Sequence, residues 1–256
     1  MNKYQAKHKI LIEESGGKVQ DIFVEEVGVL LTKKPSVSEK ALDLFEKLNI
    51  DNERPEYEQH AEFNSRLTYL SFKNNKEGSK EYNEKMINEY GHRSVYNDEH
   101  VTFLIAGCSI ETMLEFIAHN EATVARLTSS KTNAQNETLY RIRTKGLSKE
   151  FIEIQKKMIK TYLSEVATLS SPETDIEKEI TNILNLGNKA VSFTISMSIK
   201  DWHKTLIGRL SHHGVETEML EILEKVVEVL KTEYPIFFKN KEEYYEMNNN
   251  KKYEEK

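Results

Sequence analysis

Few residues of this 256-residue chain stand in a generic catalytic arrangement. Phosphate-binding glycine loops, the HExxH zinc motif and the GxSxG nucleophile motif are absent from the sequence. Cys108 is the single cysteine and follows an apolar run, so we interpret it as a small buried hydrophobe rather than a nucleophile. The neighbouring His212 and His213 point in different directions on a helix or strand, which suits a tetrahedral zinc site poorly. We therefore predict no metal site.

The residues that do suggest chemistry lie in three ordered segments. They are GHRSVYNDEHVTFLIAG at 91–107, SIETMLEFIAHNEATVARLTSSK at 109–131, and LGNKAVSFTISMSIKDWHKTLIGRLSHHG at 186–214. Together the segments supply histidines, hydroxyls and a few cations, next to long apolar stretches that can hold them in place.

The three segments resemble, in this order, the flavin-dependent thymidylate synthases, which methylate dUMP with FAD, NADPH and methylenetetrahydrofolate. In that family a Gly-His-x-Ser/Thr segment and a following Glu-His lead into a buried strand. A helix then ends in Arg-His-Arg-x-x-Ser-x-Asn-Glu-x-Ser-x-Arg, and a late strand–helix unit carries a basic residue and an Arg with a His four residues on. The resemblance covers roughly residues 91–235.

The resemblance implies a set of cofactor-binding residues, with FAD as the cofactor and NADPH and methylenetetrahydrofolate as possible co-substrates. Glu99 and His100 match the Glu-His that follows the first motif. The implied FAD-binding residues are His92, Ser94, His119, Lys200 and His213.

The resemblance also implies residues for the pyrimidine nucleotide. Arg209 is expected to be catalytic, holding the pyrimidine and stabilising its developing anion while the flavin supplies hydride. Thr123, Arg126 and Thr128, together with Arg209, are the expected substrate-binding residues. The family reaction uses no protein nucleophile, which agrees with the interpretation of Cys108.

The signature motif departs from the family pattern at several positions. Ala118 and Asn120 replace its first two arginines, and Ser130 replaces the last. Ala125 and Arg126 stand where Asn-Glu is usual. A nucleotide phosphate needs fork-shaped donors or backbone amides, and each charge-assisted hydrogen bond contributes roughly 1.5–3 kcal/mol. Losing two arginines therefore weakens a family-type ligand by orders of magnitude unless other donors replace them.

Three functions are compatible with this pattern. The first is reductive one-carbon transfer to a pyrimidine deoxynucleotide, dUMP to dTMP in the family. The second is a divergent hydroxymethylation of a pyrimidine nucleotide. The third is a non-catalytic oligomeric scaffold that binds a nucleotide or flavin. For all three the resemblance implies a homotetramer whose sites are built between subunits.

The elements that position these residues can be predicted from local patterns. The resemblance implies an α+β fold, with a twisted, mainly antiparallel sheet and long helices. The apolar run at 100–107 predicts a strand covered on both faces, and Ser109 is a candidate N-cap for the helix that follows. In 191–198, Val191, Phe193, Ile195 and Met197 alternate with Ser192, Thr194 and Ser196, which predicts an apolar core face and a more polar face.

The remaining elements follow from periodicity. The segments Lys9–Glu13 and Val19–Leu31 read as strands flanking a hairpin turn at Ser15-Gly16-Gly17. Helices are predicted over 39–48, 56–72, 148–169, 175–186, 199–210 and 215–234, the last with an apolar stripe for a core or subunit interface. We expect a single domain over 1–239 and a charged, mobile tail over 240–256.

Composition narrows the class of protein. The formal charge of −6 argues against a protein whose main task is to grip nucleic-acid backbone. No apolar run approaches the ~20 residues of a membrane span, and the N-terminal residues lack the apolar centre of a signal peptide. We therefore expect a cytoplasmic protein with no membrane or nucleic-acid partner.

Overall fold

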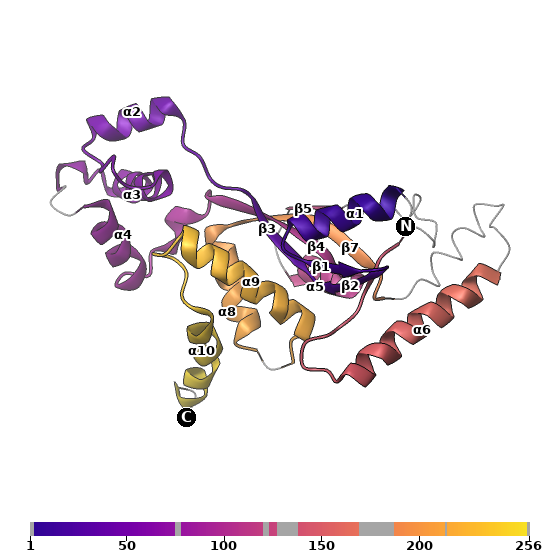
Figure 1. Cartoon of the computed structure of the whole chain (residues 1–256). Coiled ribbons are helices and arrows are strands. Elements are labelled where there is room, and N and C mark those ends of the chain that lie inside the picture. Colours follow the sequence, from indigo (N-terminus) through magenta and orange to yellow (C-terminus); the bar gives the residue numbers. More distant parts are fainter. Residues whose placement is uncertain are drawn as a thin grey trace. The chain divides into compact units, whose positions relative to one another are not determined.

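The computed structural model describes residues 3–74, 78–119, 123–126, 138–168, 187–212 and 214–254. Its elements confirm the predicted α+β class (Figure 1). In chain order they are α1 (Lys3–Glu14), β1 (Lys18–Gln20), β2 (Phe23–Glu26), β3 (Gly28–Lys33), α2 (Glu39–Lys47), α3 (Glu56–Tyr69), the 3-10 turn η1 (Phe72–Asn74), α4 (Ser79–Asn88), the 3-10 turn η2 (Arg93–Tyr96), β4 (His100–Ser109), α5 (Ile110–His119), β5 (Thr123–Arg126), β6 (Tyr140–Arg141), α6 (Lys149–Thr168), β7 (Ala190–Ser198), α8 (Ile199–Leu210), α9 (Thr217–Glu233) and α10 (Lys241–Glu254).

The strands form a four-stranded sheet of order β3-β4-β7-β5 and a three-stranded sheet of order β1-β2-β6. Side-chain bonds show that β4 and β7 run antiparallel. Thr102 donates to the Ser196 hydroxyl at 3.0 Å, whereas the Gly107 amide donates to Ser192 at 3.1 Å. Residue numbers thus rise along one strand as they fall along the other. β1 and β2 are also antiparallel, whereas the short β2–β6 pair is parallel.

Clustering of contacts divides the chain into two compact units. Unit 1 comprises Met1–Leu30, Phe103–Ile195 and Glu216–Ile222, and unit 2 comprises Leu31–Thr102, Ser196–Val215 and Leu223–Lys256. Four boundaries fall within β3, β4, β7 and α9, and the fifth lies between Val215 and Glu216, before α9. The apolar core of unit 1 includes Ile12, Val19, Val24, Ala106, Leu139 and Ala190. The core of unit 2 is rich in aromatic side chains, namely Tyr57, Tyr96, Trp202, Tyr234, Phe237 and Phe238.

The prediction of a strand over Lys9–Glu13 is wrong, because these residues belong to helix α1. A stretch of five residues is too short to distinguish the two-residue repeat of a strand from the 3.6-residue repeat of a helix, so tertiary packing decides its conformation. Ile12 is fully buried in the core of unit 1, whereas Ile10 is 59% exposed. The expected hairpin turn is the end of the helix: Gly16 has φ +79°, and the Gly17 amide donates to the Ile12 carbonyl at 2.9 Å. Glycine serves helix C-termini and hairpin turns equally well.

Strand β7 confirms the predicted core face, with one correction on the other face. Phe193, Ile195 and Met197 are buried, as expected, and Thr194 and Ser196 are half-buried. Ser192, expected on the more polar side, is also buried because its hydroxyl bonds with His8 Nε2 at 2.8 Å and accepts from the Gly107 amide. A buried hydroxyl is tolerated when both of its partners are in place. Burial lowers the pKa of His8 to about 4, so its ring is neutral at neutral pH.

The helix predictions hold wherever the structure describes the residues, with ends that shift by one to three positions. Ser109 caps α5 as predicted, since its hydroxyl accepts from the Thr112 amide at 3.2 Å. The apolar stripe of α9 is buried within the chain. The helix predicted over 175–186 lies outside the described residues.

The segment predicted to be a tail contains helix α10. Tyr244 of this helix is fully buried, and its hydroxyl lies 2.9 Å from Nδ1 of His203. Among the described residues, no helix combines the length and the apolar character that crossing a bilayer requires.

Phe193 offers a test of the register of β7. Its ring packs against Phe116, with ring centroids 5.8 Å apart, and it is 1% exposed. Phe193→Ala should lower the free energy of unfolding by about 3–5 kcal/mol in chemical denaturation. Ile10→Ala is the control, because Ile10 is 59% exposed on α1 and its loss should cost well under 1 kcal/mol. Equal losses in the two variants would show that the register is wrong.

Candidate functional site

The first candidate segment lies at the turn η2 in unit 2. His92 and Ser94 are both exposed there. The His92 amide donates to the Met86 carbonyl at 2.9 Å, which fixes the start of the turn against the end of α4. The ring of His92 stands edge-on to Tyr90, with centroids 6.1 Å apart. Both candidate side chains are therefore held in place by the backbone and free to meet a ligand.

The second candidate segment is the start of α8, which carries the exposed Lys200. Ser198 caps this helix, accepting from the Asp201 amide at 3.1 Å. The Ile199 amide donates to the Glu99 carbonyl at 2.8 Å, so the helix starts beside the residues that follow η2. Chain segments about a hundred residues apart, which sequence reasoning assigned to one ligand, thus meet within unit 2.

A small cavity lies where these segments meet. Its volume is about 10 Å³ and its lining consists of Tyr96, Ile199, Lys200, His203 and Phe237. That volume is about what one water molecule requires and is far too small for a flavin ring. Any large ligand here must therefore rest on the exposed groups of unit 2 and cannot enter this cavity.

Arg209 lies in the last turn of α8 and is half-buried. It stands nine residues after Lys200, roughly 13 Å along the helix axis. A cation at this end is stabilised by the helix dipole. The structure therefore places the two candidate cations of α8 at opposite ends of one rigid element.

The remaining candidates belong to unit 1 or lie outside the described residues. His119 is the last residue of α5, and Thr123 and Arg126 are the first and last residues of β5. Thr128 and His213 lie outside the described residues. Cys108 is fully buried, and burial raises the pKa of its thiol, which disfavours the reactive thiolate.

A buried ionic network fixes the start of α5. Glu218 at the start of α9 is fully buried and accepts from the Ser109 amide at 3.1 Å and from the Ser109 and Thr112 hydroxyls at 2.6 and 2.9 Å. Arg141, whose side chain is 2% exposed, donates to Glu218 through Nε at 2.8 Å and to Glu221 through Nη2 at 2.8 Å. The carboxylate of Glu218 is thereby compensated by one cation and three further donors.

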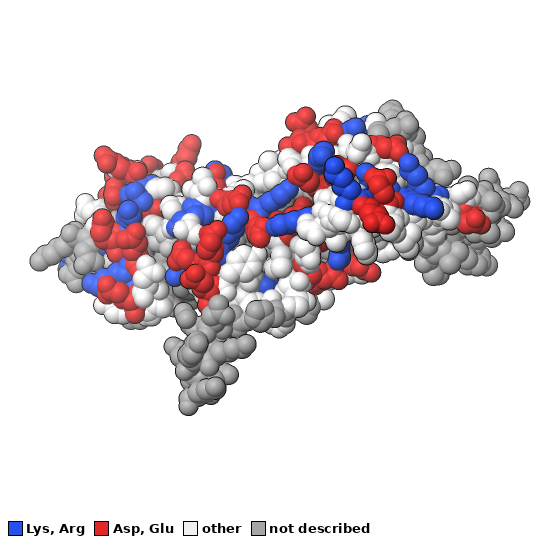
Figure 2. Space-filling model, turned by 60° about the horizontal axis from the view of Figure 1, so that its bottom comes forward, with Lys and Arg blue, Asp and Glu red and all other residues white. Residues whose placement is uncertain are grey.

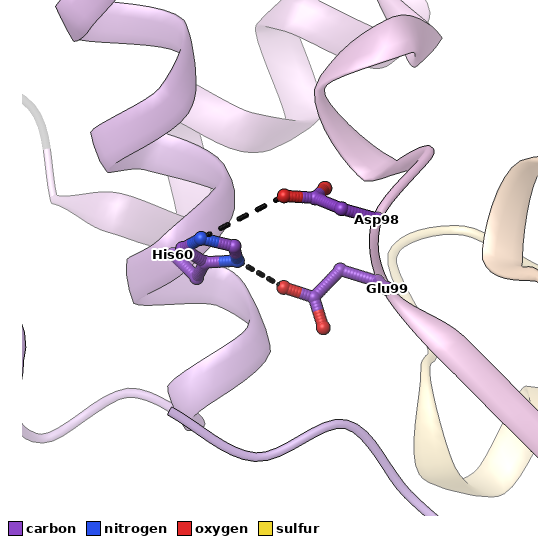
Figure 3. Close-up of side chains that lie close together, drawn as sticks. All are labelled: His60, Asp98 and Glu99. Atoms are coloured by element: carbon purple, nitrogen blue, oxygen red, sulfur yellow. Dashed lines mark hydrogen bonds and ion pairs between the residues drawn. The ribbon is translucent and has the colours of Figure 1, made fainter. Parts of the chain in front are cut away.

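A cluster that sequence reasoning did not single out lies in unit 2 (Figure 3). His60 of α3 stands between Asp98 and Glu99, with Nδ1 bonded to Glu99 and Nε2 3.8 Å from an Asp98 oxygen. The bond to Glu99 and the nearby charges of Glu99 and Asp98 raise the pKa of His60. His60 carries no local signal, because its partners are 38 and 39 residues away in sequence.

Charges of both signs are mixed on the described surface that Figure 2 shows. The hollow along α4 is lined by Glu81, Glu84 and Glu89 with Lys85 and Asn88, the wrong sign for an anionic ligand. Lys200 and Arg209 are therefore anion-binding candidates because of their positions at the two ends of α8 rather than because of a general excess of positive charge.

Two comparisons with known proteins show what this chain is similar to. A family model described as "Thymidylate synthase complementing protein" matches residues 50–236. Among solved structures, thymidylate synthase X from Helicobacter pylori, determined with FAD and dUMP, is similar with a TM-score of 0.57 and 18% sequence identity. The match covers 83% of this chain and 97% of that chain. No curated protein matches the chain.

The ionic network yields a stability prediction. Arg141→Met should leave the Glu218 carboxylate buried without its cation and lower the free energy of unfolding by about 3–5 kcal/mol in chemical denaturation. The control is Arg143→Met, because Arg143 pairs with Glu216 where both side chains are 43% exposed. Such a surface pair contributes about 0–1 kcal/mol. A loss in Arg141→Met no larger than in the control would contradict the role given to the network.

Proposed function

This chain belongs to the thymidylate synthase complementing protein family, and we propose that it transfers a one-carbon unit reductively to a pyrimidine deoxynucleotide, dUMP in the first instance, in the cytoplasm. The match over residues 50–236 carries the proposal, because it contains η2 and both ends of α8. The similar solved structure, which holds FAD and dUMP, supports the same fold for this chain.

FAD is the cofactor of the proposal, and the chemistry of the exposed groups fits it. Lys200 offers an ammonium, His92 an imidazole and Ser94 a hydroxyl, and all three are exposed in unit 2. These are donors that suit the two negative charges of a pyrophosphate. When bound, FAD supplies hydride to the reaction. His119 and His213 complete the proposed cofactor set, with NADPH and methylenetetrahydrofolate as co-substrates.

The nucleotide is proposed to bind at the other end of α8. Arg209 presents a guanidinium fork, which binds carbonyl or phosphate oxygens with two parallel hydrogen bonds. The same group would stabilise negative charge as it develops on the pyrimidine ring. Thr123, Arg126 and Thr128 are proposed to supply further donors. Since Ala118 and Asn120 stand in place of signature arginines, Arg209 must carry a larger share of the ligand's charge.

A second function is favoured by these same replacements. Ala118 and Asn120 lack two guanidinium forks, and Ala125 and Arg126 lack the usual Asn-Glu pair. A chain that binds a nucleotide or flavin without methylating dUMP, as a scaffold or as a hydroxymethylase of another pyrimidine, needs none of those groups. Binding and turnover of dUMP therefore separate the two proposals.

The cavity beside Lys200 is too small for a cofactor, so the proposal includes a second copy that covers the exposed groups. Apolar side chains that are 43–67% exposed suit such contacts on two helices of unit 1. They are Leu114 and Ile117 on α5 and Phe151, Ile154 and Met158 on α6. The proposed assembly is a homotetramer. The apolar stripe on α9 is not part of the proposed subunit interface, because its side chains are buried within the chain.

The ligand prediction concerns Arg209. We expect the purified protein to show the absorption bands of bound flavin and to bind dUMP with micromolar affinity by titration calorimetry. Arg209→Ala should weaken dUMP binding at least about 100-fold, the loss of one or two charge-assisted bonds, and leave the flavin bands in place. Lys204→Ala, which removes an exposed cation from the same helix, should leave dUMP binding unchanged.

Two results would count against the ligand proposal. Flavin bands without heat from millimolar dUMP would favour the second function. A colourless protein that takes up neither FAD nor dUMP would rule out both cofactor and substrate.

The assembly prediction concerns mass in solution. Light scattering at micromolar concentration should return the mass of four chains of 29.8 kDa. Met158→Glu should shift that mass downward, because a charge placed in an apolar interface loses its hydration. The control Lys157→Glu changes charge on α6 outside the apolar stripe and should leave the mass unchanged. A single-chain mass for the unmodified protein would contradict the proposed assembly.

A further inference from the structure

The cluster of His60, Asp98 and Glu99 has an arrangement that the proposed function does not use. In Figure 3 the two ring nitrogens of His60 face two different carboxylates. Nδ1 bonds with Glu99, and Nε2 faces Asp98. The carboxylates differ in surroundings, since the side chain of Glu99 is 4% exposed and that of Asp98 is 58% exposed.

Glu99 is placed to orient the imidazole. A carboxylate that accepts the Nδ1 proton fixes the ring and its tautomer, and leaves the lone pair of Nε2 pointing outward. Histidines that bind metal ions nearly always have such a partner on their second nitrogen. The buried side of this cluster thus has the form of the outer support of a metal site.

The side chains of Asp98 and Asn64 lie on the other side, at Nε2. The Asp98 oxygen lies 3.8 Å from Nε2, and Nδ2 of the Asn64 amide lies 3.5 Å from Nε2 and 3.4 Å from that same oxygen. The Asn64 amide is also 3.4 Å from the Val95 carbonyl. A tetrahedral ion at 2.1 Å from two ligand atoms needs them about 3.4 Å apart, so Asp98 has to move only a few tenths of an ångström.

The amide of Asn64 can serve as a third ligand. Its oxygen and nitrogen exchange places when the amide turns by 180°, which brings Oδ1 toward Nε2 and Asp98. All of these groups come from α3 and from the segment between η2 and β4, within unit 2. The exposure of Asp98 leaves room for water to complete the coordination.

We propose that His60 Nε2, the Asp98 carboxylate and the Asn64 amide oxygen bind a divalent transition-metal ion, with Glu99 as the positioning residue. One nitrogen and two oxygen ligands with open water positions suit Zn²⁺ and other borderline ions better than Mg²⁺, which prefers oxygen alone. This site goes beyond the proposed function, since none of its three ligands is a residue assigned to flavin or nucleotide.

The ion would strengthen the local structure around η2. The Glu99 carbonyl accepts from the Ile199 amide, and Asp98 precedes Glu99 in the segment between η2 and β4. Fixing His60, Asn64 and Asp98 on one ion therefore ties α3 to the segment on which α8 begins. Its role is structural.

The test is a Zn²⁺ titration of the full chain after treatment with a chelator and removal of the chelator. We expect one Zn²⁺ per chain with micromolar or tighter affinity, and no comparable heat from Mg²⁺. His60→Gln and Asp98→Asn should each weaken Zn²⁺ binding at least 10-fold, and Glu99→Gln should weaken it by about 10–100-fold, as expected for loss of an outer partner. His212→Gln, which removes another exposed imidazole of unit 2, should leave the affinity unchanged.

Circular dichroism of each variant establishes that it is folded. If His60→Gln fails to fold, Asp98→Asn decides the matter, since its carboxylate is largely exposed. The proposal is overturned if Zn²⁺ gives no saturable uptake, if folded His60→Gln or Asp98→Asn binds it as tightly as the unmodified chain, or if His212→Gln is the variant that loses it. Zn²⁺ uptake is read without flavin or dUMP, so its failure is distinct from failure of the proposed function.

Discussion

A buried carboxylate imposes the strictest condition on this fold. Glu218 is fully buried, and removing its charge from water costs several kcal/mol unless donors replace the water. The donors come from the adjoining end of β4 and first turn of α5, and from β6, about thirty residues further along the chain. Because none of them can be omitted, the start of α9 must lie where these three elements meet. The position of α5, and so of the signature segment at its end, follows from that condition.

Unit 2 meets a similar condition through backbone bonds. The Glu99 carbonyl accepts a hydrogen bond from the Ile199 amide, and the Val101 carbonyl accepts one from the indole Nε1 of Trp202 at 3.1 Å. These two bonds attach the first turn of α8 to the start of β4. The exposed Lys200 and the turn η2 are thereby held close together by groups that take no part in ligand binding. Exposed side chains around η2 and the start of α8 can therefore change while this attachment persists.

The sequence predicts correctly those elements that are determined by residues close together in the chain. The alternation of β7 and the cap at Ser109 involve neighbours within a few residues, so local pattern was sufficient for them. Ser192 was placed on the polar face because its partner, His8, is 184 residues away and no local pattern reveals it. The run at Lys9–Glu13 is compatible with a strand because its three consecutive apolar residues fit the period of either a strand or a helix, whereas the burial of Ile12 in the folded chain favours a helix. His60 could not be identified from the sequence for the same reason, because its carboxylate partners come close to it only in the folded chain.

Glu99 connects the two sites of unit 2. Its side chain holds the imidazole of His60, and its backbone carbonyl holds the start of α8. Sequence similarity marked this residue for the flavin-side motif, where a glutamate precedes a histidine. In the structure His100 is exposed and its Nδ1 lies 3.0 Å from the Asp98 carbonyl, whereas Glu99 is turned inward to His60. A change at Glu99 therefore acts on Lys200 through the backbone and on Asp98 through the ring of His60. Because Glu99 is buried and bonds with both His60 and Ile199, the position of the cluster at α3 and the position of the start of α8 depend on one another.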